Sequence, residues 1–329
     1  MKSSWTRDQP EIAFDTAAIE ALLAPLFPAQ RVVSFAQVSG GLINTNLKVI
    51  TERHATPVLL RVYQGDPAHA AKEVAITARI AGTVPVANSL YFSATNPFSG
   101  HPYAILEWID GQTFEAIRNS LDRSAAAGLG RSIGHTLAAI HSFTFDKPGF
   151  FAADLSVPDA IDLDRGGLLA YLTRCLVDGP GGVRLGPELT ASILAFGQRE
   201  GEMLNAWLDP PSLVHGDFNG PNILVRPNTA GDPEVAAVLD WEFALSGSPA
   251  LDFGNLLRPP LAHDADFLAM VADGYRKAGG FLPTEWQHIA RIADLFAWAD
   301  IVSRPKVGPE VVADARRVVA DIIAAREAC

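Results

Sequence analysis

The feature that most restricts the possible fold is a short polar block in the second half of the chain. In this block Asp217 and Asn222 stand five residues apart, in a segment that glycine and proline keep from forming a helix. A second carboxylate, Asp240, follows 23 residues after Asp217, at the end of the apolar run 235–239. A fold that uses these side chains must bring two adjacent strand ends together.

Two carboxylates and one amide that converge from adjacent strand ends suit a hard divalent cation. Mg²⁺ prefers oxygen ligands, and it usually keeps waters and substrate phosphates in its shell. One of the carboxylates can instead accept the proton of an attacking hydroxyl. Kinase chemistry needs this division of labour, with one base Asp and then an Asn and a second Asp on the metal. The block therefore predicts phosphoryl transfer.

The first third of the chain predicts a small sheet. Apolar runs separated by turn residues favour five strands, with one helix inserted after the third strand and another helix, Phe14–Leu26, before the sheet. The predicted strands are Val32–Val38, Leu47–Ile50, Val58–Tyr63, Leu90–Ser93 and Tyr103–Ile109, and the inserted helix is His69–Gly82.

The remainder of the chain predicts mainly helices. From Asp122 onward, apolar residues recur at three- and four-residue spacing, which is typical of amphipathic helices. Short strands are predicted near 212–215, 223–226 and 235–239, and a loop over 178–187. The glycines at 128, 130 and 134 do not have the spacing of a dinucleotide fingerprint, and we interpret them as sites of close helix packing.

Together these residues resemble the aminoglycoside phosphotransferase/choline kinase-like family, over roughly residues 36–258. The resemblance implies an α+β fold of the protein-kinase-like bilobal type. It implies a nucleotide-binding lobe with a small antiparallel sheet over 1–106, a hinge over 107–111, and a mainly helical lobe with the catalytic loop and acceptor site over 112–329. The implied enzyme is a small-molecule kinase that uses ATP and Mg²⁺ and has a small-molecule hydroxyl acceptor.

The resemblance also implies roles for individual residues. Asp217 takes the position of the catalytic Asp, and Asn222 and Asp240 take those of the metal-binding residues. The implied nucleotide-binding residues are Ser39, Gly40, Gly41, Asn44, Arg61, Glu73, Glu107 and Ile109. The first four lie in a phosphate-covering loop, the next two form an ion pair beside the phosphates, and the last two hold adenine through backbone groups.

Three further polar residues are interpreted as structural. His215 precedes the catalytic position and is expected to brace the loop by hydrogen bonds rather than to carry protons. His141 ends a predicted helix and is expected to lie near the same loop. Asp252 is expected to support the loops by accepting backbone N–H bonds, and not to bind metal.

Charge restricts the classes of partner. The chain has 26 Lys and Arg against 37 Asp and Glu, a net charge of −11, which argues against nucleic acid and anionic membranes as partners. Residues 1–106 carry +1 and residues 107–329 carry −12. The acidic part favours either a cationic acceptor, such as an amino sugar or amino alcohol, or solubility alone. With two cysteines and no apolar segment typical of a signal peptide, a cytoplasmic location is expected.

Two alternatives remain from the sequence. One is a non-catalytic nucleotide-binding module of the same fold, although such a module has no reason to keep Asp217, Asn222 and Asp240 together. The other is a protein kinase, although Asp240 is followed by Trp and Glu and no Ala-Pro-Glu motif follows it. The acceptor, the choice between ATP and GTP, and the oligomeric state stay open.

Overall fold

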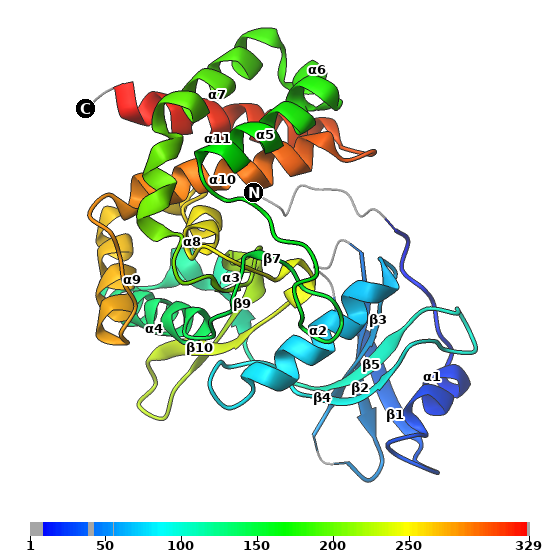
Figure 1. Ribbon diagram of the computed structural model, residues 1–329. Coiled ribbons are helices and arrows are strands. Elements are labelled where there is room, and N and C mark those ends of the chain that lie inside the picture. The colour runs from blue at the N-terminus through cyan, green and yellow to red at the C-terminus, as the bar shows by residue number, and fades with distance from the viewer. Residues whose placement is uncertain (1–8, 39–42, 55, 328–329) are drawn as a thin grey trace.

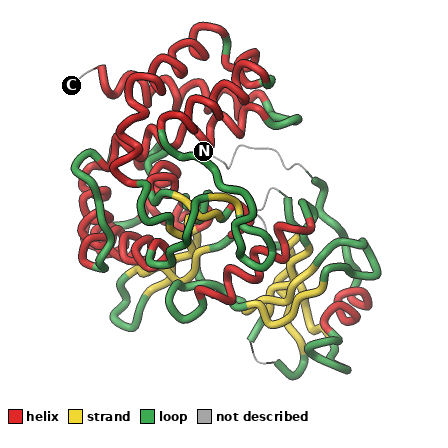
Figure 2. Tube along the Cα trace, in the orientation of Figure 1, coloured by secondary structure: helices red, strands yellow, loops and turns green. Residues whose placement is uncertain are grey.

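The computed structural model describes residues 9–38, 43–54 and 56–327, and it contains two differently built regions (Figure 1). A five-stranded sheet with two helices lies on one side of the molecule, and most of the other helices lie on the opposite side (Figure 2). A small antiparallel sheet combined with a mainly helical region confirms the predicted α+β fold class.

The elements are as follows. The strands are β1 (Val32–Gln37), β2 (Thr45–Thr51), β3 (Val58–Val62), β4 (Ser89–Ser93), β5 (Tyr103–Glu107), β6 (Gln112–Thr113), β7 (Gly149–Phe150), β8 (Ser212–Val214), β9 (Ile223–Pro227), β10 (Pro233–Val238) and β11 (Leu245–Gly247). The helices are α1 (Thr16–Leu23), α2 (Pro67–Ile80), α3 (Phe114–Ile117), α4 (Arg123–His141), α5 (Arg165–Thr173), α6 (Gly181–Leu185), α7 (Pro187–Glu200), α8 (Ala250–Leu256), α9 (Ala265–Lys277), α10 (Trp286–Ser303) and α11 (Pro309–Glu327).

The five-stranded sheet has the order β1-β2-β3-β5-β4, and every pair is antiparallel. Side chains on a strand alternate between the two faces of the sheet, so neighbours on β3 have different surroundings. Leu60 and Val62 pack with α1 in one apolar cluster. Arg61 points to the opposite face, where Ala70 of α2 and Leu106 of β5 form another cluster. The alternation therefore directs one cation of a buried strand towards α2.

Close packing of α4 against α9 holds the helical region together. A Cβ at Gly134 of α4 would lie 2.0 Å from the carbonyl oxygen of Val271 on α9, and one at Gly130 would lie 3.0 Å from the Cβ of Met270. These contacts confirm the interpretation of Gly130 and Gly134 as packing sites. Gly128 differs, because a Cβ there would meet nothing within 4 Å.

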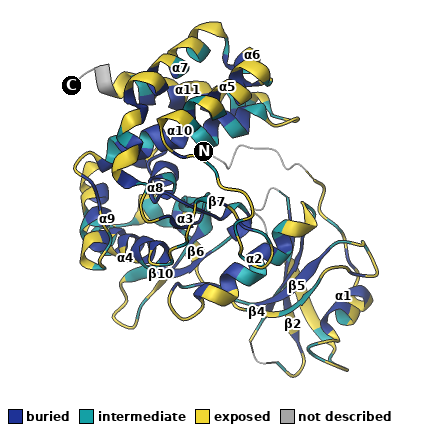
Figure 3. Ribbon diagram, viewed as in Figure 1, coloured by how far each residue is buried: buried dark blue, intermediate teal, exposed yellow. Residues whose placement is uncertain are grey.

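Two three-stranded sheets carry the polar block identified in the sequence. β8 pairs with β11 in the sheet β7-β11-β8, and β9 pairs with β10 in the sheet β10-β9-β6. In the β9–β10 hairpin, Val238 lies opposite Ile223, so the residues that follow β10 lie beside those that precede β9. α8, most of which is buried, follows β11 (Figure 3).

Helices α5, α6, α7, α10 and α11 form a group at the top of the view in Figure 1. The segment 178–187, predicted as a loop, contains the helix α6, and its glycines were the reason that no helix was predicted there. Gly182 allows this helix to pack tightly, because a Cβ there would lie 2.1 Å from the carbonyl oxygen of Leu176. Among the described residues, every helix is too short or too polar to cross a bilayer.

Candidate active site

The loop between β8 and β9, residues 215–222, surrounds the side chain of Asp217. Gly216 has a φ of +78°, and a Cβ there would lie 2.5 Å from the carbonyl oxygen of Phe243, so only glycine fits. The Asp217 Oδ1 atom accepts a hydrogen bond from Asn219 Nδ2 at 2.7 Å, and its Oδ2 atom accepts one from Asn222 Nδ2 at 2.8 Å. Two amide donors thus fix the orientation of a carboxylate that is 7% exposed.

Asp252, at the start of α8, supports this loop from below. Its side chain is fully buried, and its two oxygens accept the backbone N–H groups of His215 and Gly216, both at 2.8 Å. His141 Nε2 lies 3.2 Å from the same carboxylate, and His141 Nδ1 lies 2.9 Å from the hydroxyl of Tyr275. The side chains therefore connect α4, α8 and α9 beneath the loop, which agrees with the structural interpretation of Asp252 and His141.

His215 also braces the loop. Its Nδ1 atom accepts the backbone N–H of Asp217 at 3.1 Å, and its Nε2 atom lies 2.9 Å from the carbonyl oxygen of Leu239. The carbonyl can only accept, so the ring proton sits on Nε2 and the imidazole is neutral. Both ring nitrogens are occupied, which leaves His215 no atom with which to carry protons for a substrate.

Asp240 lies beside Asn222 because of the β9–β10 hairpin. The backbone N–H of Leu239 donates to the carbonyl oxygen of Asn222 at 2.9 Å. Asp240 itself has φ 70° and ψ 69°, a left-handed conformation that non-glycine residues seldom adopt. This strained backbone turns the carboxylate out of the strand and into the same space as Asn222.

Arg61 of β3 connects the five-stranded sheet to that space. Its Nη1 atom lies 3.3 Å from Glu73 Oε1 of α2, and its Nη2 atom forms an ion pair with Asp240 Oδ1. Arg61 is 7% exposed and Glu73 is 5% exposed. The predicted pair of Arg61 and Glu73 is therefore present, and it extends to one of the two predicted metal-binding residues.

A cavity of about 1810 Å³ runs between the five-stranded sheet and the helical region. It is larger than the roughly 300–1,000 Å³ of a typical single-ligand site, so it has room for two substrates. The described residues with predicted roles that line it are Asn44, Arg61, Glu107, Ile109, Asp217, Asn222 and Asp240. Glu73 lies behind Arg61 and not on the wall. Ser39, Gly40 and Gly41 lie outside the described residues.

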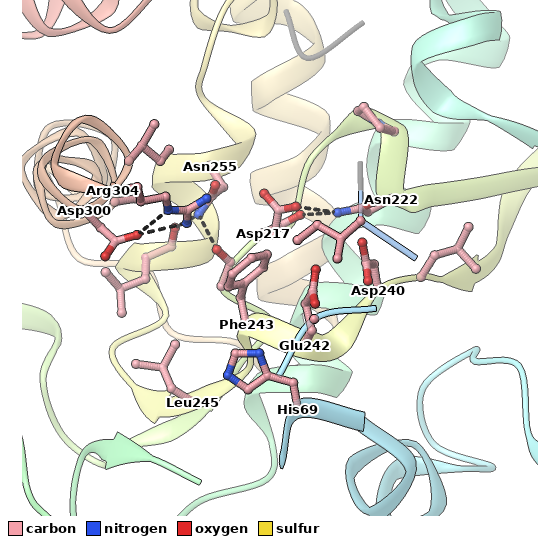
Figure 4. A pocket seen from close by; sticks show the side chains of 18 of the residues that line it. His69, Asp217, Asn222, Asp240, Glu242, Phe243, Leu245, Asn255, Asp300 and Arg304 are labelled. Atoms are coloured by element: carbon pink, nitrogen blue, oxygen red, sulfur yellow. Dashed lines mark hydrogen bonds and ion pairs between the residues drawn. The ribbon is translucent and has the colours of Figure 1, made fainter. Parts of the chain in front are cut away.

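We name the two ends of this cavity by the residues that Figure 4 labels. The Asp217 end contains Asp217, Asn222, Asp240 and Glu242, with Arg61 beside them. The Arg304 end is lined by residues of the segments 150–184, 251–258 and 293–311. In Figure 4 the side chains of Phe243 and Asn255 lie between the two ends.

The segment after β5 borders the Asp217 end with backbone groups. The Glu107 carboxylate turns away, since its Oε2 atom accepts a hydrogen bond from Asn88 Nδ2 at 2.7 Å. The backbone N–H of Ile109 donates to no atom in the described part of the chain. Trp108 is held by Lys48, which lies 4.2 Å from the centroid of its ring, and by Asp110, which accepts its Nε1–H at 2.7 Å. Because contacts of Trp108 hold this segment in place, the unused backbone N–H of Ile109 can donate a hydrogen bond to a planar heterocycle in the cavity.

The sequence pattern of the phosphotransferase enzyme family (APH) matches residues 34–291. This match covers most of the chain, including the sheet, Arg61, Asp217 and Asp240. The chain belongs to the phosphotransferase enzyme family. The match confirms the predicted family and the predicted enzyme class, a small-molecule kinase. No curated protein matches the chain by sequence.

Solved structures show the same fold for this phosphotransferase. The GDP and kanamycin complex of APH(2")-IIia has a TM-score of 0.69 and 16% identity, and the match covers 93% of this chain and 98% of that one. A thermostable mutant of aminoglycoside phosphotransferase APH(4)-Ia, in a ternary complex with AMP-PNP and hygromycin B, has a TM-score of 0.66 and 17% identity, with 94% and 99% covered. The wild-type aminoglycoside 2'-phosphotransferase-IIIa complex with GDP has a TM-score of 0.69 and 15% identity, with 95% and 100% covered.

The phosphotransferase site includes two charged residues that the sequence analysis did not assign. Glu242 follows Asp240 by two positions, is 7% exposed and lines the cavity. Lys72 of α2 is 4% exposed, and its Nζ donates to the carbonyl oxygen of Ala244 at 3.2 Å. The sequence did contain a signal for Glu242, because it is a second acid only two positions after Asp240. Lys72 gave no signal, because α2 and the segment after Asp240 meet only in three dimensions.

Burial dominates the electrostatics of the Asp217 end. Desolvation raises the pKa of the Glu242 carboxyl to about 8, and the nearby Asp240 charge raises it too. Desolvation also raises the pKa of Glu73 to about 7, and the Arg61 guanidinium limits that rise. For Arg61 itself, burial would lower the pKa, but Glu73 and Asp240 together raise it above its ordinary value. This phosphotransferase thus concentrates buried carboxylates at the Asp217 end, where a nearby cation such as Arg61 is needed to stabilise their charged forms.

Proposed function

We propose that this phosphotransferase transfers the γ-phosphoryl group of ATP to a hydroxyl of a small molecule. The observation that carries the proposal is the convergence of Asp217, Asn222 and Asp240 at one end of a cavity that Arg61 also reaches. The cavity volume leaves room for a nucleotide and an acceptor side by side. AMP-PNP and GDP in the similar structures support a nucleotide substrate.

Asp217 is the proposed base. Its carboxylate lines the cavity and is aimed by the amides of Asn219 and Asn222, so it can accept a hydrogen bond from an acceptor hydroxyl and then its proton. His215 cannot share this role, because both of its ring nitrogens are used inside the protein. Catalysis then depends mainly on positioning and electrostatics, as in other phosphoryl transfers.

Asn222 and Asp240 are the proposed Mg²⁺ ligands, and their free atoms fit that ion. The Asn222 amide nitrogen is used by Asp217, while its Oδ1 atom has no partner among the described residues. Among the described residues, Asp240 uses Oδ1 on Arg61 and leaves Oδ2 without a partner, and its side chain is 29% exposed. Mg²⁺ needs only one or two protein oxygens beside waters and phosphates. When bound, the ion would neutralise charge on the nucleotide phosphates.

Arg61, oriented by Glu73, is the proposed contact to the non-transferred phosphates. A guanidinium fork suits phosphate oxygens, and its position against Asp240 brings it to the proposed metal site. The backbone groups of Glu107 and Ile109 are the proposed contacts to adenine. Ser39, Gly40, Gly41 and Asn44 stay a prediction for covering the phosphates.

Replacing Asp217 with Asn tests the central role. We expect Asp217→Asn to lower turnover by roughly 10²–10⁴-fold, because the amide cannot accept the proton, while ATP still binds. Coupled ADP release with an acceptor measures turnover, and calorimetry with Mg²⁺ and a non-hydrolysable ATP analogue measures binding. Near-normal turnover would remove Asp217 from the base role.

The same assays separate the two alternatives. Binding of Mg²⁺-ATP by the unaltered protein, without transfer to any acceptor, would favour a non-catalytic module. Incorporation of phosphate into protein substrates would favour a protein kinase. Kanamycin and hygromycin B, which are ligands in the similar structures, represent the predicted amino-sugar class of acceptor in the screen.

A further inference from the structure

The excess of acidic residues in the helical region is not found at the Arg304 end of the cavity. The charged side chains that line this end are the cations Arg174, Arg184, Arg258, Arg304 and Lys306 and the acids Asp162, Asp294, Asp300 and Glu310. This described lining has one positive charge in excess, whereas residues 107–329 as a whole carry −12. The overall acidity of the chain is therefore no guide to the charge of the acceptor.

Two of the four acids are already neutralised by arginines in the same wall. Asp294 accepts three hydrogen bonds from Arg258, at 2.6 to 3.1 Å, and both side chains are almost fully buried. Asp300 accepts hydrogen bonds from Nε and Nη2 of Arg304 at 3.0 and 2.9 Å. An ammonium group in this space would have to displace Arg258 to reach Asp294, whereas at Asp300 the Oδ2 atom is held by Arg304 and the Oδ1 atom accepts the hydroxyl of Tyr171 at 3.2 Å.

Several cations at this end have no carboxylate partner among the described residues. Arg174 lies with its guanidinium 4.6 Å from the ring centroid of Tyr171 and has no ion pair. Lys306 is exposed, lines the cavity and forms no hydrogen bond or ion pair with its side chain among the described residues. Arg184 donates only to backbone carbonyls, including that of Val302 at 2.6 Å. The same lining holds two acids, Asp162 and Glu310, that form no ion pair among the described residues, so the cations without such a pair outnumber the acids by one and the space attracts an anion.

The position of these groups relative to Asp217 suits an acceptor that spans the cavity. The Arg304 guanidinium lies 5.5 Å from the ring centroid of Phe243, and the Phe243 carbonyl packs against Gly216, which precedes Asp217. Phe243 adds apolar wall between the ends, and Phe296 adds apolar wall at the Arg304 end. A molecule can therefore place a hydroxyl at Asp217 and a charged group among the cations.

We infer that the acceptor of this kinase is an anionic hydroxy compound, whose carboxylate or phosphate binds Arg174 and Lys306, with Arg184 in the same wall. The inference rests on the proposed function, and it specifies the acceptor class of the same site. Arginine forks bind planar carboxylates and phosphates through paired N–H donors, and lysine adds a point charge. For a cationic amino sugar or amino alcohol, this end offers two carboxylates without an ion pair among the described residues, Asp162 and Glu310, against three such cations.

The first experiment compares acceptors that differ in one group. The series is para-(hydroxymethyl)benzoate, para-(hydroxymethyl)phenyl phosphate, para-(hydroxymethyl)benzamide and para-(hydroxymethyl)benzylamine, with kanamycin and hygromycin B as larger cationic probes. We expect kcat/KM from coupled ADP release, corrected for hydrolysis by water, to be about tenfold or more higher for an anionic member than for the amine. The relative rates of the benzoate and the phosphate distinguish the two anions. Equal or faster reaction of the amine, kanamycin or hygromycin B would overturn the inference.

The second experiment changes the cations. Arg174→Gln combined with Lys306→Gln is expected to raise KM for the preferred anion about tenfold or more and to leave KM for ATP unchanged. Arg174→Glu is expected to shift preference towards the amine, a result that a merely structural arginine would not produce. The matched controls are Arg165→Gln and Lys277→Gln, because these cations pair with Glu202 and Asp273 away from the cavity. An unchanged KM in the double variant would contradict the inference.

Failure of the inference differs from failure of the proposed function. If Mg²⁺-ATP does not bind, the proposed function fails. If Mg²⁺-ATP binds but no probe accepts phosphate, calorimetry on the protein with Mg²⁺ and ADP compares binding of the benzoate, phosphate and amine probes. Tighter binding of either anion supports the inference, and equal or weaker binding of both overturns it.

Discussion

The two ends of the cavity are built in opposite ways. At the Asp217 end the charged groups are buried and connected, with Arg61 between Glu73 and Asp240 and with Asp217 held by two amides. At the Arg304 end, the Arg304 side chain is 42% exposed, and Arg174 lies against the Tyr171 ring with no carboxylate partner in the part of the chain that the structure describes. The Arg304 end also contains one buried pair, Arg258 with Asp294, so the difference lies in the exposed cations that only this end carries.

The difference between the two ends shows how one fold can hold reactive groups rigidly at one place and leave the residues that bind a substrate free to vary at another. Phosphoryl transfer needs its groups held within a narrow geometry, which buried networks provide. An exposed charge on a helix end can change without disturbing the core. The Asp217 end should therefore be sensitive in both stability and activity, and the exposed cations of the Arg304 end only in acceptor binding.

The largest effect is expected at Asp252, beneath the loop 215–222. Asp252→Ala should lower the free energy of unfolding by about 3–5 kcal/mol and abolish turnover, because it leaves buried backbone N–H groups and His141 without their acceptor. Chemical denaturation measures the change. Asp266→Ala is the matched control: its ion pair with Arg123 is exposed and contributes less than about 1 kcal/mol. Equal effects of the two variants would break the comparison.

The next effect concerns α4, the helix that carries His141. Gly134→Ala should destabilise the protein by about 1–3 kcal/mol or more, because the new methyl group would overlap the carbonyl of Val271. Gly128→Ala in the same helix should stabilise it by up to about 1 kcal/mol, because the site is open and alanine favours helix. Thermal unfolding of both variants measures the difference, and a shift of the same sign in both would contradict the packing interpretation.

The pH dependence of stability sharpens the contrast. Burial raises the pKa of Glu242 from 4.5 to about 8 in the folded protein, so the folded state binds this proton more tightly than the unfolded state. Stability should therefore be greater below pH 4.5 as far as this group is concerned, and should fall as the pH rises towards 8. Glu242→Gln should flatten that slope in metal-free, nucleotide-free protein, as followed by the melting temperature.

A matched carboxylate provides the control for this slope. Glu202 is 62% exposed and pairs with Arg165. Glu202→Gln should leave the pH dependence of the melting temperature unchanged, since exposed pairs are weak. If Glu202→Gln and Glu242→Gln flattened the slope equally, burial at the Asp217 end would not be its cause.

The smallest effect is expected at the Arg304 end. Arg174→Gln should change the free energy of unfolding by no more than about 0.5 kcal/mol, because an exposed side chain without an ion pair is replaced. Urea denaturation measures this change beside the acceptor KM described above. A loss of several kcal/mol would mean that the two ends are equally part of the folded framework.

Local patterns were sufficient to predict most elements. The five strands and α2 follow from runs and alternation that lie within a few residues, and the structure places them close to their predicted limits. The prediction of a loop over 178–187 was wrong. It relied on the rule that glycine disfavours helix, whereas Gly182 here permits the close contact of α6 with Leu176. Packing overrode a local preference at that point.

The site divides in the same way. The short spacing from Asp217 to Asn222 and the hairpin before Asp240 are local, so the sequence alone determined that these groups meet, and with them the family and its chemistry. The contact of Arg61 with Asp240 joins residues 179 positions apart, and the charge of the Arg304 end is assembled from separate segments. Only the tertiary structure decided these, because net charge records how many charged residues a chain has, whereas folding determines which of them share a cavity.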